Sequence, residues 1–523
     1  MPALDADARA RLSARTDQGL SWVLLLVGVF VGGVTILQMF LTARSGAYLI
    51  GDMKSGIWMS IANDLHLGTF YRPMVSDFGY GGTRYMWLQP VLVAVLSKVG
   101  LSVLAAEFVL TIATNVGLLA VIYRVLRGAG VRPMNALPAA GLLGAVVPFQ
   151  YVLLTFSSDT LAIVLGLLGF TLALEGRRDG KHRTLFLGMV LLASTFLAKQ
   201  TSIMFGGAFG IWLLAQKDYP RAFRLAGLAI ATFGLGLAIT ALGGLWLNEG
   251  PMSMVVFKKS ANVAHGRPAP LTARLGLSVA RVAKELYTEP MLIIATLVAI
   301  WRALWRETRD VYLLLFAVVV VTLIAIYVAP GTAFNHVVES AAVGLVLVGL
   351  ELERRGWKVL KVALIAGGLY IGVPVATTFL GRPPWSSDSW ATADALVAKI
   401  RTLPDDGPIL SEQPIIPIMA GQRAFLGDPM SLSELKRLVP EIEHGFHQRL
   451  RGRHFKAVVL NWDPIERLDW YEKEAIGRGF VCDLLSHYKQ DESFGSLTLW
   501  VPDPAATPAK ICETAPTPAE QIP

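Results

Sequence analysis

Apolar runs of roughly 15 to 23 residues recur through the first 380 residues, and short charged connections separate them. A helix needs about 20 apolar residues to cross a bilayer, and a backbone inside lipid must satisfy its own hydrogen bonds. Only 16% of the residues are charged, whereas soluble proteins carry about a quarter. The sequence therefore predicts an α-helical polytopic membrane protein.

The apolar runs predict about eleven membrane spans, at 20–41, 101–126, 134–153, 160–175, 184–199, 201–216, 225–247, 289–306, 311–329, 334–351 and 360–380. Between the first two, Met53 to Leu67 predicts a helix along the membrane surface, and Trp87 to Val99 a short re-entrant or surface helix. The expected parts of the chain are an N-terminal segment (1–19), a membrane domain (20–380) with a polar loop (42–100), a small α/β domain (381–503) and a disordered tail (504–523).

Five connections rich in lysine and arginine fall on one side of the membrane if the spans alternate in direction. The positive-inside rule assigns this side to the cytoplasm, together with the N-terminus. The polar loop 42–100, the connection 248–288 and the C-terminal α/β domain are then expected on the outer face. The five connections hold Arg124, Arg127 and Arg132; Arg177, Arg178, Lys181 and Arg183; Lys217, Arg221 and Arg224; Arg302, Arg306 and Arg309; and Arg354, Arg355, Lys358 and Lys361.

The C-terminal domain combines short runs of β-type residues with helical patterns. Two helices are predicted, Ser431 to Arg451 and Ile465 to Arg478. Strands are predicted at Ala457–Leu460, at Leu497–Val501 and around Ile409 and Leu410.

The membrane part and the C-terminal part of the chain also differ in net charge. Residues 381–523 carry 15 Lys and Arg against 20 Asp and Glu, and the first 380 residues carry 32 against 19. Basic membrane loops are orientation signals first, so this distribution argues against nucleic acid as a partner. The two cysteines, Cys482 and Cys512, lie in the acidic part. Their spacing leaves both a disulfide and two free thiols open.

Polar residues gather at the predicted outer ends of the spans. Ionisable groups at membrane depth are costly and tend to mark functional sites. Five separate segments on one face could share one cavity, which would suit a ligand with a charged head and a lipid tail. The candidates are Asp52, Asp77, Arg84 and Tyr85 of the polar loop; Asp159; Lys199 and Gln200; Lys258, Lys259, His265 and Arg267; and Asn335, His336 and Glu339.

Structural explanations compete with binding at most of these positions. A lone loop carboxylate such as Asp52 is usually a surface residue, although aromatic residues crowd it here. Asp159 follows two serines, which is also a helix N-cap pattern. Lys199 fits a lysine that extends to the membrane interface, and the basic connection 248–288 fits attraction to anionic headgroups. Capping also competes at Asn335 and His336, whereas Glu339, inside an apolar run, is harder to explain in this way.

The spacing of the polar residues indicates no metal cluster, phosphate-binding P-loop, dinucleotide fingerprint or nucleophile elbow. This argues against ATP-driven transport and against serine hydrolase chemistry. The aspartates of the polar loop offer oxygen ligands of the kind that divalent cations prefer, so metal dependence stays open.

The order of an aspartate after the first span, a surface helix, and then Asp77 to Tyr85 (DFGYGGTRY) resembles the GT-C superfamily of integral membrane glycosyltransferases. Within it, the chain is similar to bacterial protein-mannosyltransferases and aminoarabinose transferases. Two features depart from these relatives: Met53 and Lys54 follow Asp52 where many have a second acid, and Gly82 stands where many have proline. Further similar segments are 158–162, 198–201, 335–339, 409–414, 421–423 and 428–429.

The resemblance implies a GT-C-like fold in a bacterial cytoplasmic (inner) membrane. It implies transfer of a sugar from a polyprenyl-phosphate donor to a cell-envelope glycan, lipid or protein. Asp52 would be the general base for the acceptor hydroxyl, and cations would stabilise the departing phosphate. Candidates for these cations are Lys199, Arg84, His336 and the 258–267 cluster. The product would have an inverted anomeric configuration.

Two other functions remain open from the sequence. A transporter or flippase for a lipid-linked glycan would keep the basic cavity, but it should show broken helices in pairs or internal repeats, and the sequence shows none. A glycan polymerase or ligase would consume a lipid-linked oligosaccharide in place of a monosaccharide.

Overall fold

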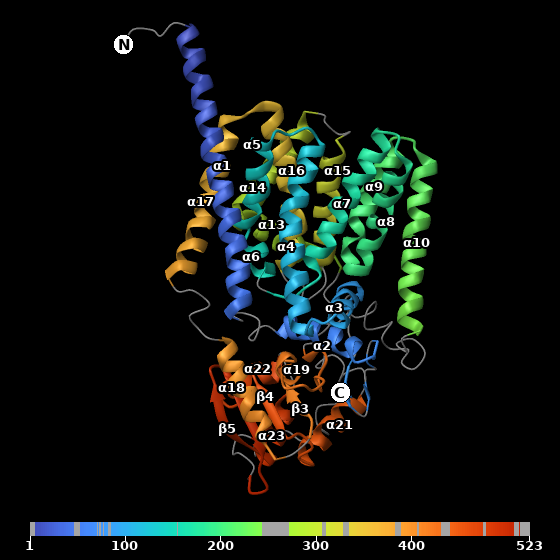
Figure 1. Ribbon diagram of the computed structural model, residues 1–523, viewed down its shortest axis with the longest axis vertical. Helices are drawn as coiled ribbons and strands as arrows, with labels where there is room; N and C mark the ends of the chain where they lie inside the picture. Colours follow the sequence, from blue (N-terminus) through green and yellow to red (C-terminus); the bar gives the residue numbers. More distant parts are fainter. Residues whose placement is uncertain are drawn as a thin grey trace.

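The protein consists of a bundle of long helices and a small α/β domain stacked on one end of the bundle (Figure 1). The computed structural model describes residues 6–45, 53–70, 72, 75–76, 78–81, 85–153, 155–242, 271–305, 310–327, 334–381, 389–404, 407–429, 440–473, 477–506 and 512. Helix α1 (Ala6–Ser45) begins at the end of the bundle far from the α/β domain.

The bundle is built from helices, most of them apolar and running between its two ends, together with short 3-10 turns. They are α1, α4 (Val103–Gly128), α5 (Pro133–Gly141) with the 3-10 turn η1 (Leu142–Ala145) and α6 (Val147–Leu153), α7 (Asp159–Arg178), α8 (His182–Ala198), η2 (Gln200–Ser202), α9 (Ile203–Ala215), α10 (Tyr219–Leu242), α13 (Leu271–Thr288), α14 (Pro290–Leu304), α15 (Val311–Tyr327), η4 (Phe334–His336), α16 (Val337–Arg355) and α17 (Lys358–Gly381).

Four of the described helices are long and apolar enough to cross a membrane: Ser13–Ser45, Val103–Gly128, Asp159–Arg178 and Lys358–Thr377. Two bent pairs also qualify if each counts as one span. They are Pro133–Ala145 with Val147–Leu153, bent by 77°, and Thr272–Glu285 with Pro290–Leu304, bent by 109°. The chain is thus a multi-pass α-helical membrane protein, while the number of about eleven spans stays a prediction.

Small residues let neighbouring helices of the bundle approach closely. Membrane helices depend on such close packing because lipid tails are as apolar as their side chains, so the hydrophobic effect does not drive the helices together. A Cβ atom on Gly176 of α7 would lie 2.2 Å from the backbone nitrogen of Leu185 of α8. Most of the buried apolar side chains of the bundle form one continuous cluster that includes Phe149, Phe205 and Leu347.

Helix α13 lies within 248–288, where the sequence predicts only an outer connection. It is amphipathic: Val282 is buried, whereas Arg281 and Lys284 are exposed, and the Ser278 hydroxyl donates to the Ile324 carbonyl oxygen of α15. Such a helix lacks a long apolar run, and hydropathy alone does not detect it.

Two short helices and a hairpin lie between the bundle and the α/β domain (Figure 1). They are α2 (Met53–His66), α3 (Leu88–Lys98) and the strands β1 (Val75–Ser76) and β2 (Gly79–Tyr80). Both helices predicted in the polar loop are therefore present.

The α/β domain contains a four-stranded sheet in the order β3-β4-β6-β5, with β3 and β4 parallel and the other pairs antiparallel. The three predicted strands are confirmed as β3 (Ile409–Ser411), β4 (Ala457–Leu460) and β6 (Leu497–Pro502). The remaining elements are α18 (Ser389–Arg401), α19 (Ile415–Met419), α21 (Pro440–Arg451), α22 (Leu468–Lys473), α23 (Arg478–His487) and β5 (Tyr488–Phe494).

Some elements of this domain differ from the predictions. Of the helix predicted at 465–478, the structure shows α22, and α23, which begins where that prediction ends, was not predicted. Helix α21 confirms the second half of the helix predicted at 431–451, and 431–439 lies outside the described residues. Cys482 and Cys512 form a disulfide, with Cα atoms 5.5 Å apart. The rest of the predicted disordered tail beyond 506 lies outside the described residues.

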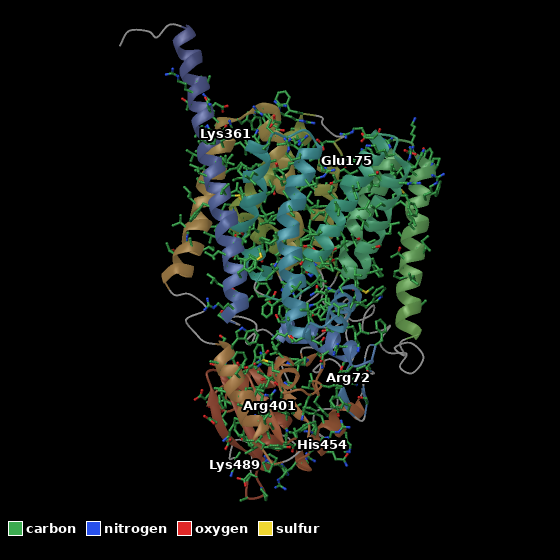
Figure 2. The ribbon with its side chains drawn as sticks, viewed as in Figure 1. Arg72, Glu175, Lys361, Arg401, His454 and Lys489 are labelled. Carbon is green, nitrogen blue, oxygen red and sulfur yellow. A yellow bond between two sulfur atoms is a disulfide. The ribbon has the colours of Figure 1, made fainter. Side chains whose placement is uncertain are left out.

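The basic connections gather at the end of the bundle far from the α/β domain. Glu175, which pairs with Arg124 at 2.6 Å, and Lys361, which pairs with Asp17 at 2.7 Å, both lie there in Figure 2, and Arg72 lies at the opposite end. The connections that carry Arg124 and Lys361 therefore lie at the same end of the bundle, as the predicted alternation requires.

Candidate active site

A cluster of alternating charges lies at the end of the bundle that faces the α/β domain, and Asp159 is its centre. Oδ1 of Asp159 lies 2.7 Å from Nζ of Lys199, and Oδ2 lies 3.0 Å from Nζ of Lys54. The side-chain amide of Asn335 also donates to Oδ2, at 2.9 Å. Asp159 is the first residue of α7, and the residue at the cap position is Ser158. Its carboxylate therefore holds three other segments together.

A break between two helices directs Lys199 into the cluster. Helix α8 ends at Ala198, Lys199 is extended (φ −152°, ψ 124°), and the chain continues through η2 into α9. The ammonium group of Lys199 bridges two carboxylates, because it also lies 2.5 Å from Oε1 of Glu339. With 11% of its side chain exposed, Lys199 does not extend to water as an interfacial lysine would.

Lys54 is a member of the cluster that the sequence did not single out. It lies in the first turn of α2, its ammonium group is 5.8 Å from the centre of the Tyr151 ring, and 16% of its side chain is exposed. The sequence marked it only as one of the two residues, Met53 and Lys54, that follow Asp52 where the resemblance led us to expect a second acid. The pair with Asp159, 105 residues away, could not be inferred from the chain alone.

The cluster is buried and balanced in charge. Lys54 and Lys199 face Asp159 and Glu339, whose side chains are only 5% and 2% exposed. A charge at this depth needs a partner, and removing one member of a buried pair costs about 3–5 kcal/mol. These four residues hold α2, α7, α16 and the α8–α9 break in one arrangement.

The other predicted site residues inside the described ranges lie around this cluster. His336 is the last residue of η4, and its Nδ1 is buried with no hydrogen-bond partner among the described residues. The Gln200 amide approaches the Met86 sulfur at 3.6 Å, and the Tyr85 ring lies 4.8 Å from that of Trp58 in α2. The structure thus brings Asp159, Lys199, Asn335 and Glu339 into direct contact.

Seven predicted site residues lie outside the described residues: Asp52, Asp77, Arg84, Lys258, Lys259, His265 and Arg267. Their assignments stay predictions. Among the residues that the structure describes, no group of three or more His, Cys, Asp or Glu side chains is arranged to hold a metal ion.

The α/β domain is fixed over this end of the bundle by the polar loop. Tyr80 of β2 donates its backbone N–H to the Phe425 carbonyl and accepts from the Gly427 N–H, both at 2.9 Å. Gly79 has φ +152°, and a Cβ atom there would lie 2.4 Å from the Phe425 oxygen, so only glycine fits. Arg72 is buried between the Asp64 carboxylate, at 2.6 Å, and the Ala424 carbonyl, at 2.5 Å.

A second contact joins the domain to α2 directly. A Cβ atom on Gly56 would lie 2.7 Å from Cδ of Pro414, and Trp58 packs in one apolar cluster with Ile415 and Ile416. The helix whose first turn carries Lys54 is thus held from both sides, by the bundle and by the domain.

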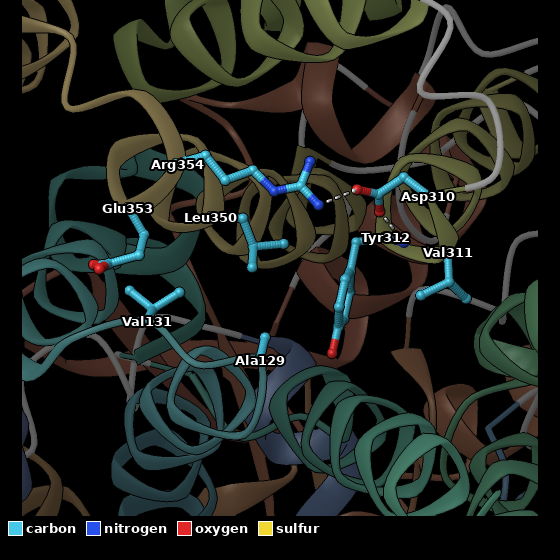
Figure 3. Close-up of a pocket in the computed structure, with 8 residues that line it drawn as sticks. All are labelled: Ala129, Val131, Asp310, Val311, Tyr312, Leu350, Glu353 and Arg354. Atoms are coloured by element: carbon cyan, nitrogen blue, oxygen red, sulfur yellow. Dashed lines mark hydrogen bonds and ion pairs between the residues drawn. The ribbon is translucent and has the colours of Figure 1, made fainter. Parts of the chain in front are cut away.

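A cavity of about 300 Å³ lies at the opposite end of the bundle, between α4, α15 and α16 (Figure 3). Its charged lining residues are already paired: Asp310 binds Arg302 and lies 3.9 Å from Arg354, and Glu353 lies 2.7 Å from Arg132. This cavity is far from the Asp159 cluster and is not the candidate active site.

Comparison with known proteins relates the fold to membrane glycosyltransferases. No protein-family model matches the sequence, and no curated protein matches it either. The structure of ArnT from Cupriavidus metallidurans bound to undecaprenyl phosphate matches over 92% of this chain and 99% of that chain, with a TM-score of 0.58 and 11% identity. ArnT in the apo state matches with a TM-score of 0.56 and 13% identity.

An archaeal enzyme is similar over the same extent of the chain. The apo oligosaccharyltransferase of Archaeoglobus fulgidus covers 94% of this chain and 75% of its own, with a TM-score of 0.52 and 11% identity. The fold is therefore the one seen in ArnT and in this oligosaccharyltransferase, in agreement with the GT-C-like fold that the sequence resemblance implied. At 11 to 13% identity, the likeness concerns the fold.

Proposed function

We propose that the protein is a membrane glycosyltransferase that moves a sugar from a polyprenyl-phosphate donor to an acceptor of the cell envelope. The observation that carries this proposal is the Asp159 cluster: two lysines and two carboxylates from four segments meet at one end of a GT-C fold, under the α/β domain. The structures most relevant to the donor are those of ArnT, one of which was solved with undecaprenyl phosphate.

The proposed reaction is an inverting displacement at the anomeric carbon. Asp52 accepts the proton of the acceptor hydroxyl, and the oxygen attacks the anomeric carbon from the face opposite the phosphate. The new C–O bond forms as the bond between sugar and phosphate breaks, and the electron pair leaves with the polyprenyl phosphate. The carboxylate of Asp159 is unsuited to the role of base, because Lys54, Lys199 and Asn335 already bind its two oxygens.

In this proposal, Lys54 and Lys199 stabilise the departing phosphate. An ammonium group has three N–H donors. Ion pairs to described residues use two of these donors at Lys199 and one at Lys54. The remaining donors can bind phosphate oxygens, and a cation fixed before the reaction stabilises developing charge without further reorganisation.

We also propose that this end of the bundle faces the outside of the cytoplasmic membrane. The basic connections lie at the other end, in agreement with the positive-inside rule. The Cys482–Cys512 disulfide is an independent argument, because disulfides persist in oxidising compartments and are rare in the cytosol.

The proposal is tested with the purified protein in lipid nanodiscs supplied with polyprenyl-phosphate monosaccharides and envelope glycans. Wild-type protein should release polyprenyl phosphate and a product of inverted configuration. Lys199→Met should lose most of this activity, and Lys181→Met should retain it. Lys181 lies at the other end of α8 and 68% of its side chain is exposed, so it is a matched control. Transbilayer flux of intact lipid-linked sugar in vesicles, without release of polyprenyl phosphate, would identify a transporter instead.

A further inference from the structure

The carboxyl ends of the parallel strands β3 and β4 lie at one edge of the C-terminal sheet. Leu410 pairs with Val458 and Ser411 with Val459. The segments after them, Glu412 to Pro414 and Asn461 to Asp463, must therefore lie side by side. In open α/β sheets, ligands commonly bind outside the carboxyl ends of parallel strands.

This edge faces the candidate active site. Pro414, three residues after β3, contacts Gly56 of α2, and Gly56 is two residues from Lys54 of the ion cluster. Figure 1 shows α19 and α22, which follow the two strands, at the end of the domain nearest α2. An acceptor bound at this edge would lie beside the end of the bundle that carries Asp159.

Buried hydrogen bonds fix the two segments in one conformation. Oε2 of Glu412 accepts from the Asn461 N–H and from the Tyr471 hydroxyl, both at 2.8 Å. The side-chain amide of Gln413 donates to Oδ1 of Asn461 at 2.7 Å. Burial raises the pKa of Glu412 to about 7, although the hydrogen bonds from Asn461 and Tyr471 act to lower it. The residues at the rim of this edge are therefore held rigidly in place.

Two tryptophans form an aromatic platform at the rim. Trp462 follows β4 by two residues and meets Trp470 of α22 edge to face, with ring centres 5.2 Å apart and planes at 80°. The guanidinium group of Arg467 lies 4.9 Å from the centre of the Trp462 ring. Both tryptophans are half-buried. An aromatic face of this kind suits the C–H-rich face of a sugar ring.

Charge around the platform favours one class of ligand. Asp463, Glu466 and Asp469 outnumber Arg467 among the described residues 461–470. Tryptophans at a membrane interface are the alternative explanation. However, anionic headgroups repel acidic side chains, which argues against a membrane anchor. The same repulsion disfavours phosphorylated glycans and glycans that contain uronic acids. Carboxylates are, by contrast, good hydrogen-bond acceptors for the hydroxyls of an uncharged sugar.

We propose that the Trp462–Trp470 platform binds a sugar ring of an uncharged acceptor glycan and holds it beside the ion cluster. This inference rests on the proposed function, which it deepens by naming the acceptor as a saccharide. The two tryptophans together supply the aromatic surface, and Asp463 and Arg467 at the rim bind hydroxyls.

The test is equilibrium binding of radiolabelled neutral hexasaccharides (maltohexaose, mannohexaose and an arabinan hexamer) to the full chain in nanodiscs, without donor. At least one should bind, and Trp462→Ala should weaken its Kd tenfold or more, while Trp462→Phe keeps most of the affinity. Trp305→Ala is the matched control, since Trp305 pairs with Trp301 at 5.1 Å outside the α/β domain and is 60% exposed. Intact disulfide formation in each variant shows that the domain has folded.

Binding that is unchanged in Trp462→Ala, or absent for all three hexasaccharides, overturns the inference. A second outcome would also overturn the inference. If brominated lipids quench tryptophan fluorescence less in Trp462→Ala than in wild type, and hexasaccharide binding is unchanged, Trp462 is a membrane anchor. Because no donor is present, failure of the proposed transferase chemistry leaves this result unaffected. Polyprenyl phosphate release without any saccharide binding would remove the inference and leave the proposed function in place.

Discussion

Neutralising Asp159 tests the ion cluster most sharply. In Asp159→Asn the shape of the side chain is kept, but Lys54 loses its carboxylate partner and Lys199 keeps only Glu339. One positive charge is left uncompensated among side chains that are 2% to 16% exposed. Breaking a buried ion pair in this way costs about 3–5 kcal/mol, so the free energy of unfolding should fall by that amount.

The same helix supplies the control. Asp179 follows the last turn of α7 and pairs with Arg178, which is 65% exposed. An exposed pair contributes about 0–1 kcal/mol, so Asp179→Asn should change stability little. Unfolding in mixed detergent micelles measures both variants. Adding Lys199→Met to Asp159→Asn removes the excess charge, and the double variant should be less destabilised than the sum of the two single changes by about 0.5–3 kcal/mol. Equal stability of the Asp159→Asn and Asp179→Asn variants would refute the reasoning.

Three further predictions concern the α/β domain and its orientation. The raised pKa of Glu412, about 7, means that its contribution to stability is complete below about pH 4.5 and is lost as the pH rises to about 7. The free energy of unfolding of the wild-type domain, measured by hydrogen exchange of β3 and β4, should thus fall by roughly 3 kcal/mol between these two pH values. In Glu412→Gln it should change little with pH, and an equal pH dependence in the two proteins would contradict this prediction. The disulfide joins cysteines that are 30 residues apart. Replacing Cys482 and Cys512 by alanine should therefore lower the free energy of unfolding of the domain by about 3 kcal/mol, measured by its resistance to proteolysis. Unchanged resistance would contradict this prediction. Lys489→Cys should react with an impermeant maleimide in intact cells and Lys181→Cys only after permeabilisation; the reverse pattern would invert the proposed topology.

The membrane class of the fold followed from the sequence because apolar runs report directly on burial in lipid. The strands β3, β4 and β6 were predicted for a related reason, since each is a run of buried apolar or β-branched residues. Strand β5 reads Tyr-Lys-Gln-Asp-Glu-Ser-Phe and is exposed over most of its length. Pairing with β6 stabilises this edge strand, and the local sequence carries no pattern that would predict it.

The candidate site was predictable in part. Asp159, Lys199, Asn335 and Glu339 were chosen as ionisable or polar residues at the ends of apolar runs, where lone charges are costly. Their contacts span 140 residues between Lys199 and Glu339 and 176 between Asn335 and Asp159. Only the packing of the helices brings them together. Lys54 was missed as a partner because a lysine in a polar loop carries no local sign that it reaches a buried carboxylate.

The central claim is that Asp52 is the base of a sugar transfer from polyprenyl phosphate, and one measurement addresses it directly. Transfer by Asp52→Asn is compared with wild type in nanodiscs, with the amount of inserted protein and its unfolding midpoint held as controls. Loss of a positioned general base typically lowers the rate by a factor of about 10² to 10⁴, and the variant should show this loss with wild-type stability. Transfer within a few-fold of wild type by a folded Asp52→Asn protein would contradict the proposed mechanism.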